Sequence, residues 1–259
     1  MFETDLILPE NGKINDMDRY RRVFTWRDDL LDQKHFFKIN FPNQLSTPII
    51  NDFQSRDKFC CLIAGNKGIK KSDPRNLYPE RISAIRWFEV NAKGDFDLYG
   101  SGWKLPAKRS GVLGRAVNLL ARLIYPHLNL TAFPSYRGML KNKSDVLRHT
   151  RFAICYENVR DLPGYITEKI FDCFLSGCVP VYWGASNIER YIPPECFIDR
   201  RQFRNTEEVY RYIKNINESE YIEFQKNIIS FLGSEAAIQF GADFFAETIV
   251  NAVVEDCAS

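Results

Sequence analysis

The sequence predicts an α/β fold built around a mostly parallel β-sheet. Short apolar runs alternate along the chain with longer segments whose apolar residues recur at helical spacing. Strands that alternate with helices in this way pair in parallel and are joined by right-handed crossovers. The length of 259 residues allows one full domain and part of a second. Hydrophobic residues make up 45% of the chain, which is enough for a sizeable core.

The individual elements follow from local pattern and from the residues that end each run. The apolar run 59–64 is followed by Gly-Asn-Lys-Gly, and the run 96–99 is followed by glycine, so both are expected to be buried strands that enter loops. Gly177 is the expected end of a helix. The expected strands are 23–25, 37–40, 59–64, 96–99, 152–156, 179–183 and 196–198, and the expected helices are 80–90, 115–125, 167–176, 207–216, 221–232 and 242–254.

These elements divide the chain into unequal parts. Residues 56–235 contain enough strands for one complete, doubly wound, Rossmann-like domain. Residues 1–55 contain two expected strands, which are too few to close a domain of that type. Residues 236–259 are expected to form a C-terminal helix, for which we consider packing back against the N-terminal part.

Charge and cysteine content exclude several classes of protein. The 35 basic and 33 acidic residues leave a net charge of +2, which argues against a nucleic-acid-binding protein. The seven cysteines, an odd number mostly in apolar runs, indicate buried free thiols in a reducing compartment. No metal site is expected, because the three histidines are far apart and no Cys-x-x-Cys occurs. A dinucleotide-dependent oxidoreductase is disfavoured, because no Gly-x-Gly-x-x-Gly follows an expected strand.

The sequence contains no stretch that is apolar enough to span a bilayer, and its first residues do not resemble a signal peptide. The segment 115–125 is a basic amphipathic helix. The favoured interpretation is a helix packed on the domain, and the alternative is contact through residues 112–126 with a membrane surface or a partner. We expect a cytoplasmic protein, with a peripheral location at the inner membrane as the alternative.

Open parallel sheets bind ligands beyond the carboxyl ends of their strands, where helix N-termini face the crevice. After the strand 152–156 and a loop, Thr167 is a candidate N-cap, with Glu168 and Lys169 in the first helical turn. A lysine at this end of a helix is locally unfavourable, and an anion such as a diphosphate would offset that cost. From local physics alone, an anion ligand and a solvated surface residue are equally weighted interpretations of Lys169.

Two further strand ends give weaker signals. Gly184, which follows the strand 179–183, would permit close approach of a ligand to the backbone. Asn66 and Lys67 follow another strand and precede the helix that contains Arg81. For both strand ends the local pattern favours the structural explanation, a tight turn in the first case and a solvated arginine in the second.

Taken together, these segments resemble a known family. Residues 156–185 (YENVRDLPGYITEKIFDCFLSGCVPVYWGA) closely resemble the donor-binding signature of the α-1,3/4-fucosyltransferases, glycosyltransferase family 10. Residues 135–138 with Lys143, and residues 197–199, are similar to the same family. Residues 24–26 (FTW) resemble a segment of its bacterial branch, and the resemblance runs from near residue 2 to the C-terminus.

The resemblance implies a GT-B architecture, in which two Rossmann-like domains face each other across a cleft. Here the C-terminal Rossmann-like domain would be complete and would hold GDP-fucose, and the acceptor-side N-terminal one would be partial. The implied reaction is inverting: an acceptor hydroxyl displaces GDP from GDP-β-L-fucose and gives an α-fucoside, of α-1,3 type. No metal or other cofactor is required, because basic side chains neutralise the leaving diphosphate. The implied acceptor is a glycan of a lipopolysaccharide, a surface polysaccharide or a glycoprotein.

The resemblance also implies roles for particular residues. Lys169 and Arg81 would bind the phosphates, with Arg86 as the substitute if the register of that helix differs by one turn. Glu168 would lie near the fucose ring and stabilise oxocarbenium-like charge. Glu3, within the acidic segment 2–5, is the candidate general base. The implied donor-binding residues are Arg81, Asn158, Tyr165, Glu168 and Lys169, and the implied catalytic residues are Glu3 and Glu168.

An alternative function belongs to another class. The chain would then be an inactive or truncated nucleotide-sugar- or carbohydrate-binding protein that lacks part of the acceptor domain. Transfer of fucose to a simple acceptor such as lactose distinguishes the two, because a binding protein would bind GDP without transfer.

Overall fold

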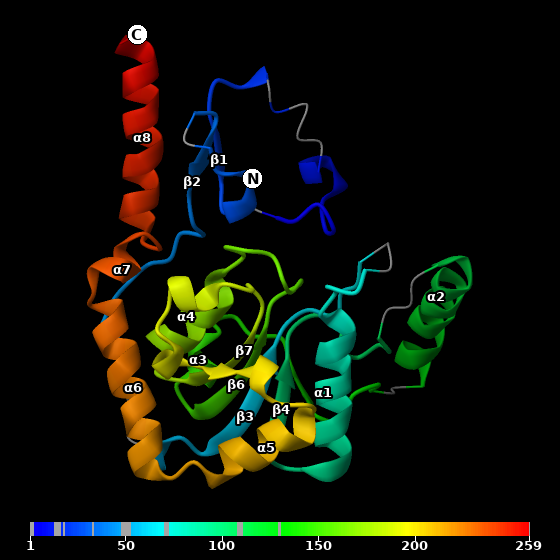
Figure 1. Cartoon of the computed structure of the whole chain (residues 1–259). Helices are drawn as coiled ribbons and strands as arrows, with labels where there is room; N and C mark the ends of the chain where they lie inside the picture. The colour runs from blue at the N-terminus through cyan, green and yellow to red at the C-terminus, as the bar shows by residue number, and fades with distance from the viewer. Residues whose placement is uncertain are drawn as a thin grey trace.

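The computed structural model describes residues 3–12, 17, 19–32, 34–47, 53–69, 73–107, 111–128 and 131–258. Among these residues a parallel sheet forms from β3 (Lys58–Ile63), β4 (Phe96–Tyr99), β5 (Tyr136–Gly138), β6 (Thr150–Tyr156), β7 (Val179–Trp183) and β8 (Ile198–Asp199). Their order in the sheet is β5-β4-β3-β6-β7-β8 (Figure 1). This is the doubly wound order, which reverses direction between β3 and β6. The predicted α/β fold with a parallel sheet is therefore confirmed.

Helices cover both faces of this sheet (Figure 1). Alternate residues of a strand point to opposite faces, so Cys60 packs with α1 (Tyr78–Asn91) and α5 (Thr206–Asn215). Cys61 instead packs with the opposite layer, which contains α3 (Ser144–Leu147), α4 (Glu168–Leu175) and most of α6 (Glu218–Leu232). Six of the seven cysteines are buried free thiols, as the sequence predicts, and Cys257 is exposed.

Local capping explains where several elements begin and end. Gly177 follows α4 with φ 64°, a left-handed conformation that favours glycine, and the predicted end of this helix is confirmed. Asn217 forms a capping box with Glu220, so α6 begins three residues before the predicted start at 221. The strand predicted at 196–198 is wrong at its start, because Cys196 lies in a 3-10 helix and only the two residues of β8 pair.

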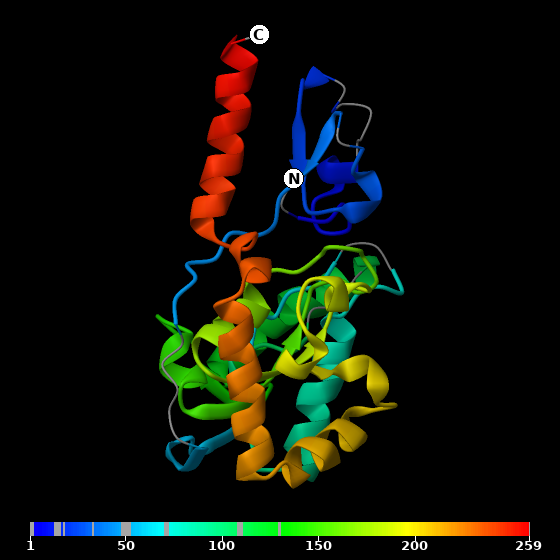
Figure 2. The same ribbon diagram turned by 60° about the vertical axis from the view of Figure 1, so that its left-hand side comes forward.

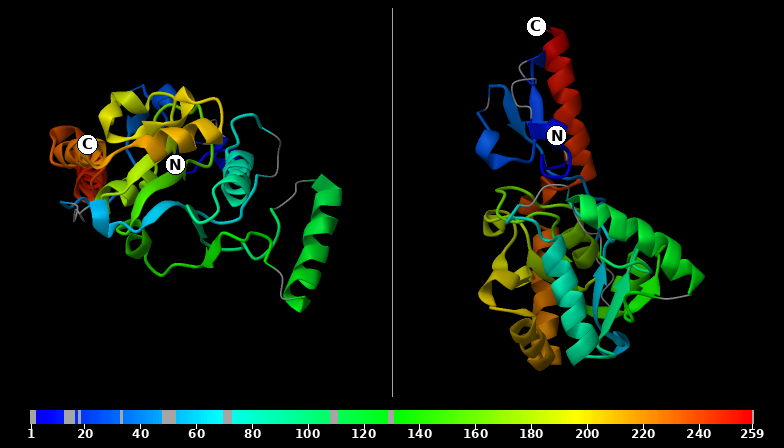
Figure 3. Two further views of the ribbon diagram at one scale, coloured as in Figure 1. Left: turned by 90° about the horizontal axis from the view of Figure 1, so that it is seen from below. Right: turned by 90° about the vertical axis from the view of Figure 1, so that its right-hand side faces the viewer.

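Helix α2 (Gly111–His127) forms as predicted, but its apolar side chains do not pack on the domain. Leu113 is 84% exposed and Leu119 is 61% exposed. The helix lies apart from the sheet (Figure 3), so the favoured interpretation, a helix packed on the domain by its apolar face, is wrong. Within the described residues, every helix is too short or too polar to cross a membrane.

The N-terminal part forms a small layer of its own. Its strands β1 (Val23–Thr25) and β2 (Phe36–Lys38) are parallel and pair with each other. The last helix, α8 (Ala242–Ala258), follows the short α7 (Glu235–Ile238) and lies beside these strands (Figures 1 and 2). Arg22 forms ion pairs of 2.9 Å with Glu255 and 3.1 Å with Asp256, so the N-terminal layer contacts the end of α8.

The carboxylate of Asp28 is one of the groups that join the N-terminal layer to the main domain. One oxygen of Asp28 accepts hydrogen bonds from Lys38 Nζ and Tyr191 Oη, both at 2.6 Å. The other oxygen accepts from Asn187 Nδ2 at 2.7 Å. Burial opposes the charge on Asp28, but these donors outweigh it and hold the pKa of the carboxyl below its usual value. Gly164, with φ 81°, lies against this cluster, where a Cβ would come within 2.2 Å of the Trp26 carbonyl oxygen.

We predict that Asp28→Asn lowers the free energy of unfolding at neutral pH by about 1 to 3 kcal/mol, the range for hydrogen bonds to charged groups. The pKa of Asp28 in the folded protein lies below 3.8, so its contribution is present above pH 3.8 and is lost as the pH falls further. The difference between wild type and variant should therefore shrink in acid. Urea unfolding monitored at neutral pH and at about pH 3 measures both effects.

Asp29→Asn is the matched control for this measurement. Asp29 lies in the same 3-10 helix, but its side chain is 45% exposed and pairs with Arg27. Its substitution should change the free energy of unfolding by less than about 1 kcal/mol. Equal stability of Asp28→Asn and wild type at neutral pH would contradict the prediction.

Candidate active site

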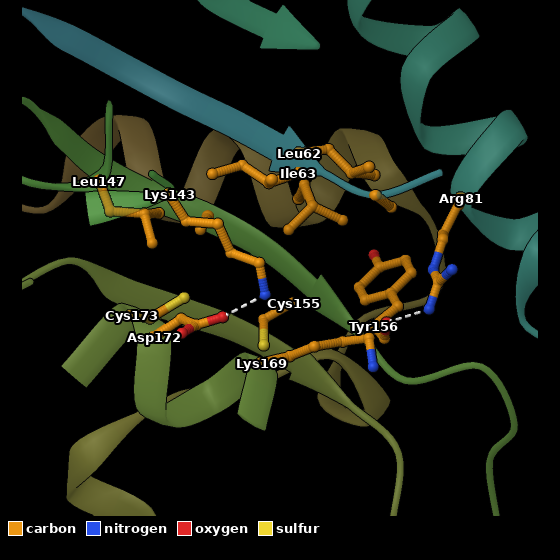
Figure 4. Close-up of a pocket in the computed structure, with 13 residues that line it drawn as sticks. Leu62, Ile63, Arg81, Lys143, Leu147, Cys155, Tyr156, Lys169, Asp172 and Cys173 are labelled. Atoms are coloured by element: carbon orange, nitrogen blue, oxygen red, sulfur yellow. Dashed lines mark hydrogen bonds and ion pairs between the residues drawn. The ribbon is translucent and has the colours of Figure 1, made fainter. Parts of the chain in front are cut away.

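A cavity of about 490 Å³ opens beyond the carboxyl ends of β3 and β6, where the strand order reverses. This is the place at which open parallel sheets bind their ligands. A smaller hollow of about 30 Å³ adjoins it, and Arg81, Lys143 and Lys169 line both (Figure 4). The three cationic side chains come from α1, from the loop after β5 and from α4. Their convergence makes the cavity suited to an anionic ligand.

Arg81 lies in the first turns of α1 and is only 3% exposed. Its Nη2 donates to the main-chain oxygen of Tyr156, at the end of β6, at 2.6 Å (Figure 4). The same nitrogen donates to Asn158 Oδ1 at 3.1 Å, and the guanidinium lies 4.9 Å from the ring centre of Tyr78. Burial lowers the pKa of Arg81, although a guanidinium stays protonated in proteins. Arg81 is therefore a fixed positive charge in the wall of the cavity.

Lys169 is held by a carboxylate that is completely buried. Glu157 Oε2 accepts from Lys169 Nζ at 3.0 Å. The Glu157 carboxylate also accepts from the backbone N–H of Thr167 at 2.8 Å and from its hydroxyl. Burial opposes the charge on Lys169, but the carboxylates of Glu157 and Glu168 outweigh burial and raise its pKa. The lysine is thus kept protonated and oriented within the cavity.

Thr167 occupies the N-cap position of α4 as predicted, but its side chain does not cap the helix. The hydroxyl serves Glu157 instead, and it also accepts a hydrogen bond of 2.9 Å from Lys169. The missing cap leaves backbone N–H groups at the start of α4, an eight-residue helix, beside the cavity. These groups add to the positive character that Lys169 supplies there.

Glu168 begins α4 and lies at the rim of the cavity, with its side chain 47% exposed. Burial alone would raise the pKa of Glu168, but Lys169 and Lys143 outweigh it and lower the pKa. Lys143 lies 3.5 Å from Glu168 and also pairs with Asp172, one turn along the same helix. Burial raises the pKa of Asp172 more than Lys143 lowers it. The rim therefore holds a carboxylate and an ammonium group side by side.

Glu3 is brought to the cavity by contacts with the donor side of the molecule. Its Oε1 accepts from the hydroxyl of Tyr165 at 2.8 Å, and its Oε2 accepts from Asn158 Nδ2 at 3.3 Å. Tyr165 is fully buried, with its ring centre 4.8 Å from that of Trp26. Burial raises the pKa of the Tyr165 hydroxyl, and the carboxylates of Glu157 and Glu3 add to the rise, so the hydroxyl is a donor. Glu3 is held in place by side chains that are far from it in sequence.

The residues that the sequence singled out therefore meet at one place. Glu3 and all five implied donor-binding residues line the cavity. Arg86 does not, because it faces another hollow, donates to the main-chain oxygen of Ala132 at 2.9 Å and lies 3.9 Å from the Phe133 ring centre. The structure therefore has the helix register that places Arg81, and not Arg86, at the site. Gly184 makes room for two side chains rather than a ligand, since a Cβ there would lie 2.3 Å from the Tyr182 hydroxyl and 2.5 Å from Glu157 Cγ.

Sequence reasoning assigned no role to two residues that organise the site. Glu157 follows an apolar strand directly, and a carboxylate in that position is a signal that could have indicated a buried ion pair. Lys143 has no local signal, because its partners Glu168 and Asp172 are about 25 residues or more away in the chain. Lys67, which lines the cavity and is exposed, was named only as part of a loop.

The arrangement can neutralise the negative charge of a phosphate-bearing ligand, and it also places a carboxylate in the same cavity. Arg81, Lys169 and the start of α4 provide positive charge in the cavity. Glu3 reaches the same cavity from the N-terminal segment and contacts Asn158, which also contacts Arg81. Charge that develops on a leaving diphosphate would be stabilised by such fixed groups. Among the described residues, no cluster of three or more His, Cys, Asp or Glu side chains is arranged to ligate a metal ion.

Part of the chain is similar to known sequences. The model of glycosyltransferase family 10 (fucosyltransferase) C-term matches residues 117–227. The alpha-(1,3)-fucosyltransferase FucT of Helicobacter pylori is 36% identical over 78 residues, which are 30% of this chain and 16% of that protein. The alpha-(1,4)-fucosyltransferase of Arabidopsis thaliana is 36% identical over 72 residues, or 28% of this chain and 18% of that protein. The chain thus matches less than a fifth of the length of these two relatives.

A solved structure supports the fold. A mutant of TarM from S. aureus superposes with a TM-score of 0.57 over 93% of this chain and 45% of that chain, at 12% sequence identity. At that identity the likeness concerns the fold alone, and it confirms the predicted GT-B type. Residues 117–227 are therefore similar to the C-terminal domain of glycosyltransferase family 10, the fucosyltransferases.

Proposed function

We propose that this protein is an inverting fucosyltransferase that transfers L-fucose from GDP-β-L-fucose to a hydroxyl of a glycan acceptor, with α-1,3 linkage. One observation carries the proposal: Arg81 and Lys169 meet at the carboxyl end of β6, and Glu3 is hydrogen-bonded into the same cavity. The family match over residues 117–227, and relatives that are named as alpha-(1,3)- and alpha-(1,4)-fucosyltransferases, support the choice of sugar.

The donor diphosphate would bind where the positive groups converge. Arg81 would contact it from α1 and Lys169 from α4, with the uncapped N–H groups of α4 between them. Departure of GDP breaks the bond between the anomeric carbon and the phosphate oxygen and leaves about one additional negative charge on the diphosphate. Fixed cations and N–H groups stabilise that charge in the transition state without reorganising.

Glu3 would act as the general base. Its carboxylate would take the proton of the acceptor hydroxyl as that oxygen bonds to the anomeric carbon from the side opposite GDP. Tyr165 and Asn158 both donate to Glu3, and they hold it at the cavity while leaving lone pairs for the proton. A base must come within about 3 Å of its proton's donor atom, directly or through one water.

Glu168 would stabilise positive charge on the fucose ring. Its lowered pKa keeps the carboxylate ionised at neutral pH, and its half-exposed position at the rim leaves it accessible to a sugar. Asn158 and Tyr165 would line the donor pocket beside it. For the acceptor we propose a glycan of a lipopolysaccharide, a surface polysaccharide or a glycoprotein, which places the reaction in polysaccharide biosynthesis or protein glycosylation.

The donor site is tested by Lys169→Met and Arg81→Lys. Loss of a fixed contact to phosphate should weaken GDP binding at least about tenfold and lower kcat/KM for GDP-fucose by about 30- to 1000-fold. Calorimetric titration with GDP and initial rates on variants with wild-type circular dichroism measure both effects. Arg86→Lys is the control and should leave both unchanged, because Arg86 lies outside the cavity. Equal losses for Arg81→Lys and Arg86→Lys, or none for Lys169→Met, would contradict the assignment.

The base is tested by Glu3→Gln, which keeps the shape of the side chain but cannot accept the proton. Turnover with GDP-fucose and lactose or N-acetyllactosamine should fall by about 100- to 10,000-fold, while GDP affinity stays within about threefold. Asp5→Asn, two residues away, should behave as wild type. Near-normal turnover of Glu3→Gln would move the base elsewhere. Tight GDP binding by the wild-type protein without transfer to any acceptor would instead support a nucleotide-sugar-binding protein.

We further propose that transfer needs no metal ion, because Arg81, Lys169 and the start of α4 already supply charge to the diphosphate. Rates measured after extensive treatment with EDTA should then equal the untreated rates. A loss of activity that Mg²⁺ or Mn²⁺ restores would refute this part of the proposal.

A further inference from the structure

Helix α2 presents an apolar face that the described residues leave uncovered. The helix follows β4 and precedes β5 in the sequence. It stands away from the sheet (Figures 1 and 3). A contiguous exposed apolar surface of this kind marks an interaction site in soluble proteins. The exposed side chains are Leu113 (84%), Val117 (40%), Leu119 (61%), Leu120 (56%), Leu123 (56%), Ile124 (47%) and Leu128 (61%).

The orientation of the helix is the reverse of that in a packed amphipathic helix. The less exposed side of the helix is formed by Gly114, which is buried, and by Asn118, Ala121 and Tyr125, which are partly buried. These four residues recur every three or four positions and share one side of the helix. The leucines lie on the other side, so the face that would normally enter a core points outward.

The charges around α2 favour a negatively charged partner. Arg115 and Arg122 are both exposed and lie seven residues apart, on the same side of the helix and at the edge of the apolar face. Between Tyr99 and Asp145 the sequence has eight Lys and Arg residues and no Asp or Glu. The remainder of the chain has 27 basic against 33 acidic residues, so positive charge is concentrated in this segment.

We propose that α2 is a membrane-binding helix that lies in the surface of a bilayer containing anionic phospholipid. Its leucines would enter the boundary between headgroups and acyl chains, and Arg115 and Arg122 would contact the phosphates. The 17 residues of the helix are too few for a span, but they suit an in-plane position. A single helix that stands apart from the sheet, with no acidic residue between Tyr99 and Asp145 in the sequence, fits an extended anionic surface better than a protein partner.

This position has a consequence for the cavity. Two short segments that flank this region in the sequence line the cavity: Gly100–Ser101 directly after β4, and Met139–Leu140 directly after β5. Met139 is 74% exposed. Membrane-bound α2 would therefore hold the cavity close to the lipid surface, where a membrane-borne acceptor is concentrated. The binding itself rests on the helix and is independent of the proposed transfer reaction.

Sedimentation with vesicles tests the proposal on the full chain. The protein should bind vesicles of phosphatidylcholine with phosphatidylglycerol, and bind vesicles of phosphatidylcholine alone at least about tenfold more weakly. Leu120→Asp with Leu123→Asp should reduce binding more than about tenfold, because two buried apolar side chains are lost. Arg115→Gln with Arg122→Gln should reduce it by about 30-fold, at about fivefold for each basic residue, and salt should do the same.

Val90→Asp is the matched control, because Val90 is 71% exposed on α1 and should not touch the membrane. GDP affinity should be unchanged in all these variants, which shows that they fold and separates this test from that of the active site. Absence of binding to either vesicle, or equal loss in Val90→Asp, would overturn the proposal. So would a concentration-dependent dimer in analytical ultracentrifugation that Leu120→Asp abolishes, since a second copy would then cover the apolar face.

Discussion

The site depends on one buried carboxylate at the end of β6. Glu157 has no exposed surface, and an unpaired charge there would cost several kcal/mol. The carboxylate accepts hydrogen bonds from the backbone N–H and the hydroxyl of Thr167 and pairs with the ammonium group of Lys169. These contacts fix the loop that leads from β6 to α4. Gly184 leaves room for the side chains of Glu157 and Tyr182, since a Cβ there would lie 2.5 Å from Glu157 Cγ and 2.3 Å from the Tyr182 hydroxyl. The same contacts that stabilise the fold therefore place the lysine at the cavity.

A second constraint joins the N-terminal layer to this site. Tyr165 is enclosed between Trp26 and Phe41, with ring centres at 4.8 Å and 6.2 Å, and its hydroxyl reaches Glu3. Asp28, which lies beside Gly164, joins the same layer to Asn187 of the main domain. The attachment thus combines buried aromatic contacts with hydrogen bonds to carboxylates. A carboxylate near the start of the described chain is positioned in this way.

Much of the fold could be predicted because its signals are local. The strand runs, the glycine after α4 and the helical spacing of α1 are each visible within about a dozen residues, and parallel pairing follows from their alternation. Strand β5 was missed because Tyr-Arg-Gly is short and only partly buried, so pairing with β4 alone defines it. The early start of α6 depends on a reciprocal cap between Asn217 and Glu220, which a hydrophobic pattern does not report.

By itself the sequence determined the parallel α/β sheet and the family resemblance of residues 156–185, because these follow from contiguous patterns. Through that resemblance it also named six of the residues that line the cavity. The tertiary structure alone decided three matters. It chose Arg81 over Arg86 through helix register, brought Lys143 to Glu168, and turned the apolar face of α2 outward. Each depends on groups that are distant in the chain, and the physical reason is that burial and pairing are properties of neighbours in space.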